Sequence, residues 1–171
     1  LSDPSLMNLL LIDISNTRTK IALADGTVVG KKFSLPTSDL SETYLRDLLA
    51  AEKIDDPSSL RFIVSSVVPA KSFLLASALG ENLTLIDHRT DLGITIDYPH
   101  PAEIGPDRLA NAVACAHAFG SPSIAVDFGT AVTFDVIGAG AVYLGGAIAP
   151  GLEAMTHYLH HRTALLPELR L

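Results

Sequence analysis

The sequence predicts an α/β fold made of two related units, of which the second is truncated. Two blocks share one pattern, in which an apolar strand ends in an aspartate, a turn of small residues follows, and a second strand begins. The first block spans residues 9–20 and contains Asp13, and the second spans residues 124–133 and contains Asp127. From the start of the first block to residue 87 the pattern reads β-β-β-α-β-α-β. The return of the same block predicts a duplicated fold.

The first unit opens with an antiparallel meander. Apolar strands are expected at residues 9–12, 20–24 and 27–30, and the dipeptide Asp25-Gly26 lies between the last two. Asp-Gly between short apolar segments is typical of a β-hairpin. The chain therefore turns back on itself twice before its first helix.

Helices and strands alternate after the meander. The spacing of leucines predicts a helix over Leu40–Glu52, for which Ser41 is a suitable N-cap. The alternation continues with a strand at 61–68, a helix at 71–79, a strand at 83–87 and an alanine-rich helix at 107–119 that Gly120 closes.

From Ile124 the meander restarts. Strands are expected to end near residues 137 and 148, and Pro150-Gly151 opens a helix that reaches His160. Only residues 163–171 follow, so the second copy lacks the α-β-α-β part of the first. We therefore expect two domains, at residues 7–120 and 121–171, and assign residues 1–6 to neither.

Composition excludes several classes of partner. The net charge is −7 and no cluster of lysine and arginine appears, which argues against binding to nucleic-acid phosphates. No stretch reaches the roughly 18 apolar residues that span a bilayer. Cys115 is the only cysteine, so a reducing compartment is favoured, and we expect a cytoplasmic protein.

The two aspartate blocks indicate where an anion would bind. Each carboxylate emerges at a strand end, beside a turn whose N–H groups and hydroxyls suit phosphate. The chain contains neither G-x-x-x-x-G-K nor G-x-G-x-x-G, so phosphate binding would use hairpin turns. Two such turns suggest a nucleotide held between paired domains. The alternative is that Asp13 and Asp127 only cap their turns.

Several separated motifs occur in one order along the chain. They are Asp13–Lys20 (D-I-S-N-T-R-T-K), Ser65–Pro69, Tyr98 with Pro99 and Pro101, Gly105–Arg108 (G-P-D-R), Val126–Thr133, Leu144–Gly146, Pro150-Gly151 and Thr163–Pro167. Together they resemble the motifs of type III pantothenate kinases, which are members of the actin-like (ribonuclease H-like) superfamily. One departure is Ser15, which stands where the family usually has glycine and would be strained if the turn needed a positive φ.

The resemblance implies an ATP-dependent enzyme that phosphorylates pantothenate to 4'-phosphopantothenate, in the first step of coenzyme A biosynthesis. It implies a homodimer and ATP, Mg2+ and a monovalent cation (K+ or NH4+) as cofactors. Its ATP-binding positions correspond to Asp13, Ile14, Ser15, Asn16, Thr17, Arg18, Thr19, Lys20, Gly129, Thr130 and Thr133. Its substrate positions correspond to Tyr98, Gly105, Pro106, Asp107 and Arg108.

Individual roles follow from the needs of phosphoryl transfer. Asp13 and Asp127 are expected to face each other across a cleft and to hold Mg2+ largely through water. By resemblance, Asp127 is also the ligand of the monovalent cation. The resemblance also implies that Asp107 is the catalytic base, which would accept the proton of the substrate hydroxyl, and Arg108 would bind the substrate carboxylate or a phosphate.

Each role has a plainer alternative. Asp107 could simply be the N-cap of the helix that follows it, Arg108 could be solvated on the first turn, and Tyr98 could be a packed loop anchor. His157 and His161 are one helical turn apart, but no third ligand accompanies them, and we assign no zinc.

Two other functions remain open at the level of the sequence. The same fold could phosphorylate another small hydroxyl compound, such as a sugar, because function depends on the site rather than on the scaffold. A non-catalytic regulator is the other, since Ser15 could mark a phosphate turn that has decayed.

Overall fold

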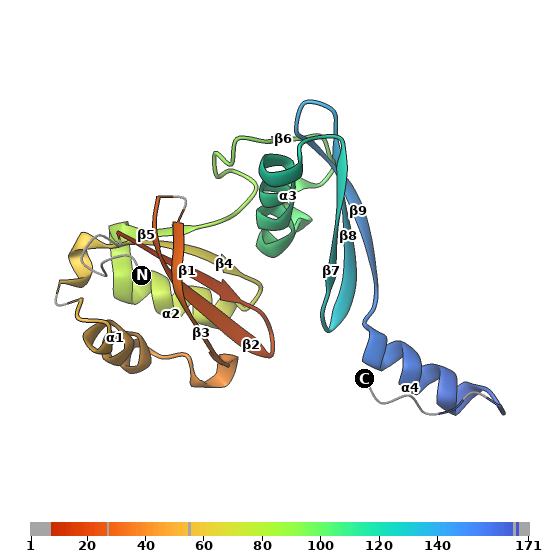
Figure 1. The fold of residues 1–171 in the computed structure, drawn as a ribbon, viewed down its shortest axis with the longest axis horizontal. Coiled ribbons are helices and arrows are strands. Elements are labelled where there is room, and N and C mark those ends of the chain that lie inside the picture. Colours follow the sequence, from red (N-terminus) through yellow and green to blue (C-terminus); the bar gives the residue numbers. More distant parts are fainter. Residues whose placement is uncertain (1–7, 27, 55, 166, 168–171) are drawn as a thin grey trace. The chain divides into compact units, whose positions relative to one another are not determined.

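The computed structural model describes residues 8–26, 28–54, 56–165 and 167. It divides into two compact units (Figure 1), unit 1 with Leu1–Arg89 and Gly105–Asp107, and unit 2 with Thr90–Ile104 and Arg108–Leu171. Met7, Thr27, Leu166 and residues 168–171, which enter the predicted domains, strands and motifs, lie outside the described residues.

Unit 1 contains the predicted β-β-β-α-β-α-β sequence of elements. These are β1 (Leu9–Ile14), β2 (Arg18–Asp25), β3 (Val28–Pro36), α1 (Glu42–Ala51), β4 (Arg61–Ser66), α2 (Pro69–Leu79) and β5 (Leu83–Leu85). The strand order in the sheet is β3-β2-β1-β4-β5. The first three strands are antiparallel, whereas β4 runs parallel to β1 and β5 parallel to β4. Ser41 caps α1 as predicted, because its hydroxyl accepts a hydrogen bond from Tyr44 N at 3.1 Å.

The core of unit 1 lies between one face of this sheet and the two helices. Alternate residues of β1 (Leu10, Ile12 and Ile14) are buried in one cluster with Leu45 of α1 and Leu75 of α2. This period of two is what a strand with one covered face requires. Asp13 lies between two of these core residues and therefore points to the opposite face.

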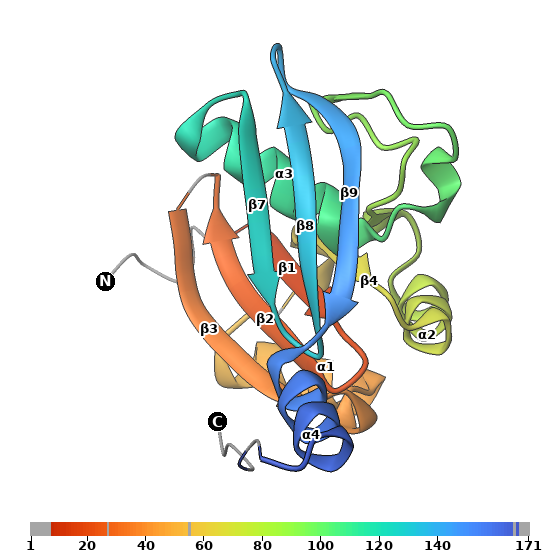
Figure 2. The same ribbon diagram turned by 90° about the vertical axis from the view of Figure 1, so that its right-hand side faces the viewer.

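Unit 2 contains the second meander. Its elements are β6 (Thr95–Ile96), most of α3 (Pro106–Phe119), β7 (Ser123–Phe128), β8 (Ala131–Gly138), β9 (Val142–Pro150) and α4 (Leu152–Arg162). The strand order is β6-β9-β8-β7. Figure 2 shows β7, β8 and β9 side by side, with α3 behind them. β6 was not predicted, because a two-residue strand carries no alternating pattern.

The helix at the border of the units differs in detail from the prediction. α3 begins at Pro106, so Asp107 lies inside its first turn and is not its N-cap. Residues 90–104 and 108–120 group with unit 2, whereas the sequence places them in the domain 7–120. The division into repeats at residue 120 remains a prediction. Among the described residues, no helix has the length and apolar character needed to cross a bilayer.

Candidate functional site

The first aspartate turn connects β1 to β2 in unit 1. Asp13 is the penultimate residue of β1 and pairs across the sheet with Lys20, with 3.8 Å between Asp13 Oδ2 and Lys20 Nζ. The turn itself closes through a hydrogen bond of 3.1 Å from Ser15 N to Arg18 O. Asn16 and Thr17 are exposed at its tip. The turn therefore presents polar groups beside a strand-end carboxylate.

Two threonines stabilise this turn through hydrogen bonds. Thr37 Oγ1 donates to Ser15 O at 2.7 Å and lies 3.1 Å from the hydroxyl of Thr19, which is fully buried. Ser15 is not among the described residues with positive φ, so serine fits the turn without the strain considered above. Ile14 and Thr19 face the interior, and their side chains support the turn.

Arg18 of the first motif bonds to the neighbouring strand. Arg18 donates from Nε and Nη2 to the hydroxyl of Ser34, at 3.2 and 2.9 Å. Arg18 is the first residue of β2, so these bonds direct its side chain toward the neighbouring strand β3.

The second aspartate turn connects β7 to β8 in unit 2. Asp127 is again the penultimate residue of its strand, and it pairs in register with Thr133. Gly129 and Thr130 form the connection between the strands. The first residues after β9 support this turn, since Gly151 N donates to Thr130 O at 3.1 Å. A Cβ at Gly151 would lie 2.5 Å from Gly129 O, so only glycine fits there.

A pocket opens beside the second turn. Its volume is about 730 Å³, and its lining combines Gly129 and Thr130 with side chains of α4 that include Glu153, His157 and Arg162. His157 Nε2 and His161 Nε2 are 3.1 Å apart. Within the described ranges, no three histidine, cysteine or acidic side chains are grouped so as to hold a metal ion.

Arg108 lies in a buried polar cluster of unit 2. Its Nε donates to Asp135 Oδ1 at 2.7 Å and its Nη2 donates to Phe134 O at 3.0 Å. The side chain of Arg108 is 14% exposed and that of Asp135 is 1% exposed. Tyr143 OH donates to the same Oδ1 at 2.8 Å. Burial, reinforced by this hydrogen bond, raises the pKa of Tyr143. The alternative of a solvated Arg108 is therefore wrong.

Tyr98 lies against the glycine pair of β9. Gly145 has a φ of +107°, and a Cβ there would lie 2.9 Å from Tyr98 Cδ2. The adjacent residue, Gly146, approaches Arg108 in the same way, since a Cβ added at Gly146 would lie 2.5 Å from Arg108 Nη2. Thus Tyr98 and Arg108, both predicted substrate residues, lie against neighbouring glycines.

The other predicted substrate residues are local to the start of α3. Gly105 and Pro106 precede and open the helix, and Asp107 follows in its first turn, where the N-terminal end of the helix dipole favours an acidic side chain. These three residues belong to unit 1 and Arg108 to unit 2. The pairing of Asp13 with Asp127 across a cleft remains a prediction.

Two residues near the site were missed at the level of the sequence. Asn111, on the same helix as Asp107, donates from Nδ2 to Asp127 Oδ2 at 3.2 Å. Asp135 is the buried acid that holds Arg108. A signal existed for each, namely an amide in an otherwise alanine-rich helix and an acid between the apolar residues of a strand.

The donor set suits magnesium. Asp13 and Asp127 supply carboxylate oxygens at strand ends, and each is at least partly accessible. Mg2+ is commonly bound through one or two carboxylates together with waters and substrate phosphates, so no larger cluster of protein ligands is needed. Each aspartate taken by itself therefore offers the kind of oxygen donor that Mg2+ takes, and a site shared by the two remains a prediction.

Comparison with known proteins gives a consistent result. A family model described as type III pantothenate kinase matches residues 9–171. A type III pantothenate kinase of Akkermansia muciniphila is 45% identical over 164 residues, covering 95% of this chain and 66% of the relative. One of Methylacidiphilum infernorum is 43% identical over 159 residues, covering 93% and 57%. The chain thus spans less than two thirds of these relatives' length.

Solved structures share the fold. A putative Baf family transcriptional activator from Campylobacter jejuni superposes with a TM-score of 0.55 at 20% identity, covering 90% of this chain and 60% of that chain. A putative 2-dehydro-3-deoxygalactonokinase from Sinorhizobium meliloti gives a TM-score of 0.51 at 14% identity, covering 92% and 58%. At such identities the likeness concerns the fold alone, and it confirms the predicted actin-like α/β architecture.

Proposed function

Because the chain belongs to the type III pantothenate kinase family, we propose that the whole protein transfers the γ-phosphoryl group of ATP to the primary hydroxyl of pantothenate. The product would be 4'-phosphopantothenate, in the first step of coenzyme A biosynthesis. The observation that carries this proposal is the recurrence of one aspartate turn in both units, with Asp13 and Asp127 each penultimate in a strand.

The chain's own residues divide the work of binding. Asn16, Thr17 and Lys20 are exposed around the first turn and would contact the phosphates of ATP from one side. Gly129, Thr130 and Thr133 would contact them from the other. Phosphoryl transfer depends mainly on such positioning and on neutralising charge, because its transition state is loose. Asp13 and Asp127 would hold Mg2+ mostly through water, and the metal would offset the negative charge of the phosphates.

The acceptor would be placed by the start of α3. Arg108 would pair with the carboxylate of pantothenate, and Tyr98 would form a wall of the pocket. The hydroxyl oxygen attacks the γ-phosphorus, the bond from that phosphorus to the bridging oxygen of ADP breaks, and the hydroxyl proton passes to the carboxylate of Asp107. Since the base acts late in a loose transition state, its main task is to orient the hydroxyl.

Two finer features rest on the family resemblance, namely a monovalent cation beside Asp127 and a homodimer. The cytoplasmic location that we propose rests instead on the single cysteine, which favours a reducing compartment. A potassium ion near the phosphates would add positive charge to a chain that contains only 12 lysines and arginines.

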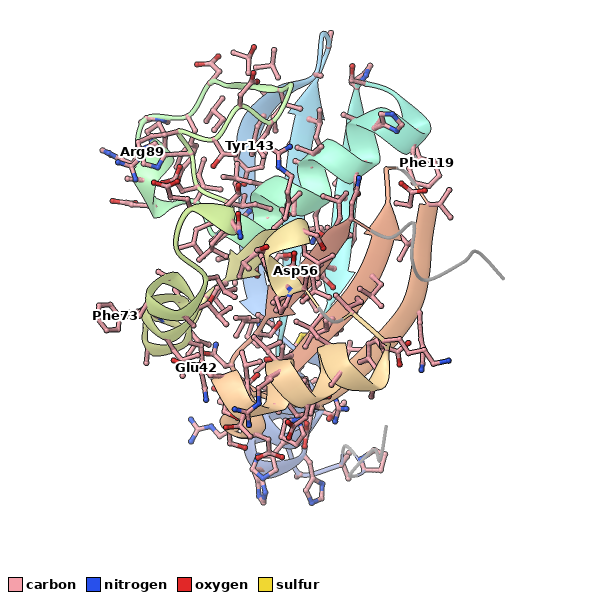
Figure 3. All side chains as sticks on the ribbon, turned by 90° about the vertical axis from the view of Figure 1, so that its left-hand side faces the viewer. Glu42, Asp56, Phe73, Arg89, Phe119 and Tyr143 are labelled. Atoms are coloured by element: carbon pink, nitrogen blue, oxygen red, sulfur yellow. The ribbon has the colours of Figure 1, made fainter. Side chains whose placement is uncertain are left out.

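A coupled assay of ADP release tests the proposal on the full native chain. We expect turnover with pantothenate, ATP and Mg2+, faster in potassium than in sodium, and none with a panel of sugars. Asp107→Asn should lower kcat by about 100-fold or more with ATP binding retained. Glu42→Gln is the matched control, because Glu42 is an exposed acid in the first turn of α1 (Figure 3).

The outcome also separates the competing functions. Turnover of a sugar without turnover of pantothenate would favour another kinase specificity. Absence of turnover together with weak ATP binding would favour a non-catalytic regulator, and either result would end the proposal. Unchanged kcat in Asp107→Asn would remove Asp107 from the mechanism alone.

A further inference from the structure

The polar cluster under α3 contains a charge that the proposed chemistry does not use. Asp135 is fully buried in β8, and burying a carboxylate is costly unless it is paired and hydrogen-bonded. Arg108 Nε and Tyr143 OH both donate to its Oδ1, at 2.7 and 2.8 Å. A buried ion pair is often no more stabilising than an apolar pair of equal volume. The cluster therefore needs an explanation besides stability.

Its geometry fixes the orientation of one guanidinium group. Arg108 is held at two nitrogens, by the carboxylate of Asp135 and by the carbonyl of Phe134, which are adjacent residues of one strand. Because guanidinium is planar, two bonds from a rigid strand determine both its position and its plane.

The strand next to β8 leaves room for this group. Gly146 of β9 is the register partner of Asp135, and a Cβ at this position would lie 2.5 Å from Arg108 Nη2. A side chain there would displace the guanidinium. The carboxylate of Asp135, the hydroxyl of Tyr143 and the bare backbone of Gly146 thus act on the same side chain.

We propose that Asp135 is a positioning residue, which holds the guanidinium of Arg108 in the orientation that receives the substrate's carboxylate. Tyr143 shares the carboxylate oxygen that accepts from Arg108, and so contributes to the same arrangement. The inference rests on the proposed function, in which Arg108 binds pantothenate. It adds a residue that acts through Arg108 and touches neither substrate.

The test compares two substrates on the full native chain. One is pantothenate and the other is its neutral analogue, in which a primary amide replaces the carboxylate. Asp135→Asn should lower kcat/KM for pantothenate by about 10- to 100-fold, the usual worth of a hydrogen bond to a charged group, and lower that of the amide by far less. The KM for ATP should not change. A purely structural role would reduce activity toward both substrates equally.

A double-mutant cycle shows whether Asp135 acts through Arg108. In an Arg108→Ala background, Asp135→Asn should cause no further loss of discrimination between the two substrates. Asp87→Asn is the matched control, because Asp87 also pairs with an arginine at 2.6 Å, and that arginine, Arg89, is exposed on the surface (Figure 3). If Asp135→Asn does not fold, Tyr143→Phe provides a second variant, because phenylalanine keeps the ring. It should lower kcat/KM for pantothenate relative to the amide by about 2- to 5-fold.

The outcomes separate this inference from the function on which it rests. Suppose that the wild type turns over pantothenate and that the folded variants keep its ratio of kcat/KM between pantothenate and the amide. That result overturns the role of Asp135 and leaves the kinase function intact. Fully additive effects of Asp135→Asn and Arg108→Ala in the double-mutant cycle have the same meaning. Absence of wild-type turnover with pantothenate overturns both.

Discussion

The opening strands of the two units have the same pattern and opposite surroundings. In β1 the alternate residues Leu10, Ile12 and Ile14 are 0%, 2% and 1% exposed. Their counterparts in β7, aligned on Asp13 and Asp127, are Ile124, Val126 and Phe128, which are 60%, 44% and 66% exposed. The strand pattern thus predicts which face is apolar, and it does not predict what covers that face.

The cause lies in the helices. In unit 1 that face packs against α1 and α2 in one hydrophobic cluster. In unit 2, α3 lies on the opposite face, where Asn111 reaches Asp127 and Arg108 reaches Asp135. Among the described residues of unit 2, the apolar face of β7 therefore stays open, together with Phe134 at its side.

The largest effect is expected where the two units are alike. Asp13→Asn and Asp127→Asn should each lower kcat by about 100- to 1,000-fold, because each removes a charge proposed to hold Mg2+ beside the phosphates. Steady-state kinetics over a range of Mg2+ concentrations provide the measurement. Asp25→Asn, at an exposed position of the next turn, is the control and should leave kcat unchanged. An effect from only one of the two aspartates would contradict a shared role.

The next effect is expected where the two units differ. Ile12→Ala should lower the free energy of unfolding of unit 1 by about 2–4 kcal/mol, since it leaves a cavity in a packed core. Val126→Ala, at the equivalent position of β7, should lower the free energy of unfolding by less than about 1 kcal/mol, because Val126 is 44% exposed. Denaturant unfolding followed by hydrogen exchange assigns each loss to its unit. Equal costs would show that the face of β7 is covered in solution.

The supports of the two turns offer a smaller contrast. Thr37→Val removes the donor to Ser15 O and leaves the buried hydroxyl of Thr19 without that partner, so a loss of about 1–3 kcal/mol is expected. Gly151→Ala crowds the carbonyls of Gly129 and Thr130 and should cost a similar amount.

Amide hydrogen exchange checks where each change acts. Thr37→Val should speed exchange around the first turn only, and Gly151→Ala around the second turn only. Thr43→Val, on the exposed side of α1, is the control and should change stability by less than about 0.5 kcal/mol. Faster exchange in both turns from one variant would contradict separate supports.

Local rules predict much of this molecule from its sequence. The Asp25-Gly26 hairpin, the Ser41 cap and the two strand-end aspartates depend only on neighbouring residues, and the structure contains all three. The order of elements in unit 1 follows from the same local periodicities.

Local sequence rules could not predict the contacts that position Arg108. Arg108 and Asp135 are 27 positions apart, and their pairing depends on how α3 packs across β8. The burial of Thr19 likewise depends on Thr37, which lies 18 positions away. A short-range pattern shows that a strand contains an acid or a hydroxyl, whereas the fold decides which side chain meets it.

The smallest expected effect concerns pH and the buried tyrosine of unit 2. Burial, with the hydrogen bond to Asp135, raises the pKa of Tyr143 above its ordinary value of 10.0. The folded chain therefore keeps the phenolic proton at pH values where the unfolded chain releases it. Below pH 10 the ionisation of Tyr143 does not change the free energy of unfolding. Above pH 10 the free energy of unfolding should fall by up to about 1.4 kcal/mol for each pH unit.

Tyr143→Phe isolates that contribution, since phenylalanine keeps the ring and carries no titrating group. The variant should be less stable than the wild type at neutral pH by about 1 kcal/mol, because it lacks the hydroxyl that donates to Asp135. The difference should shrink as the pH rises above 10, because only the wild type then loses stability through ionisation of Tyr143 in the unfolded chain. Denaturant unfolding of both proteins between pH 8 and about 11 measures it. Parallel curves would mean that Tyr143 titrates alike in the folded and unfolded chains, which is incompatible with its burial against Asp135.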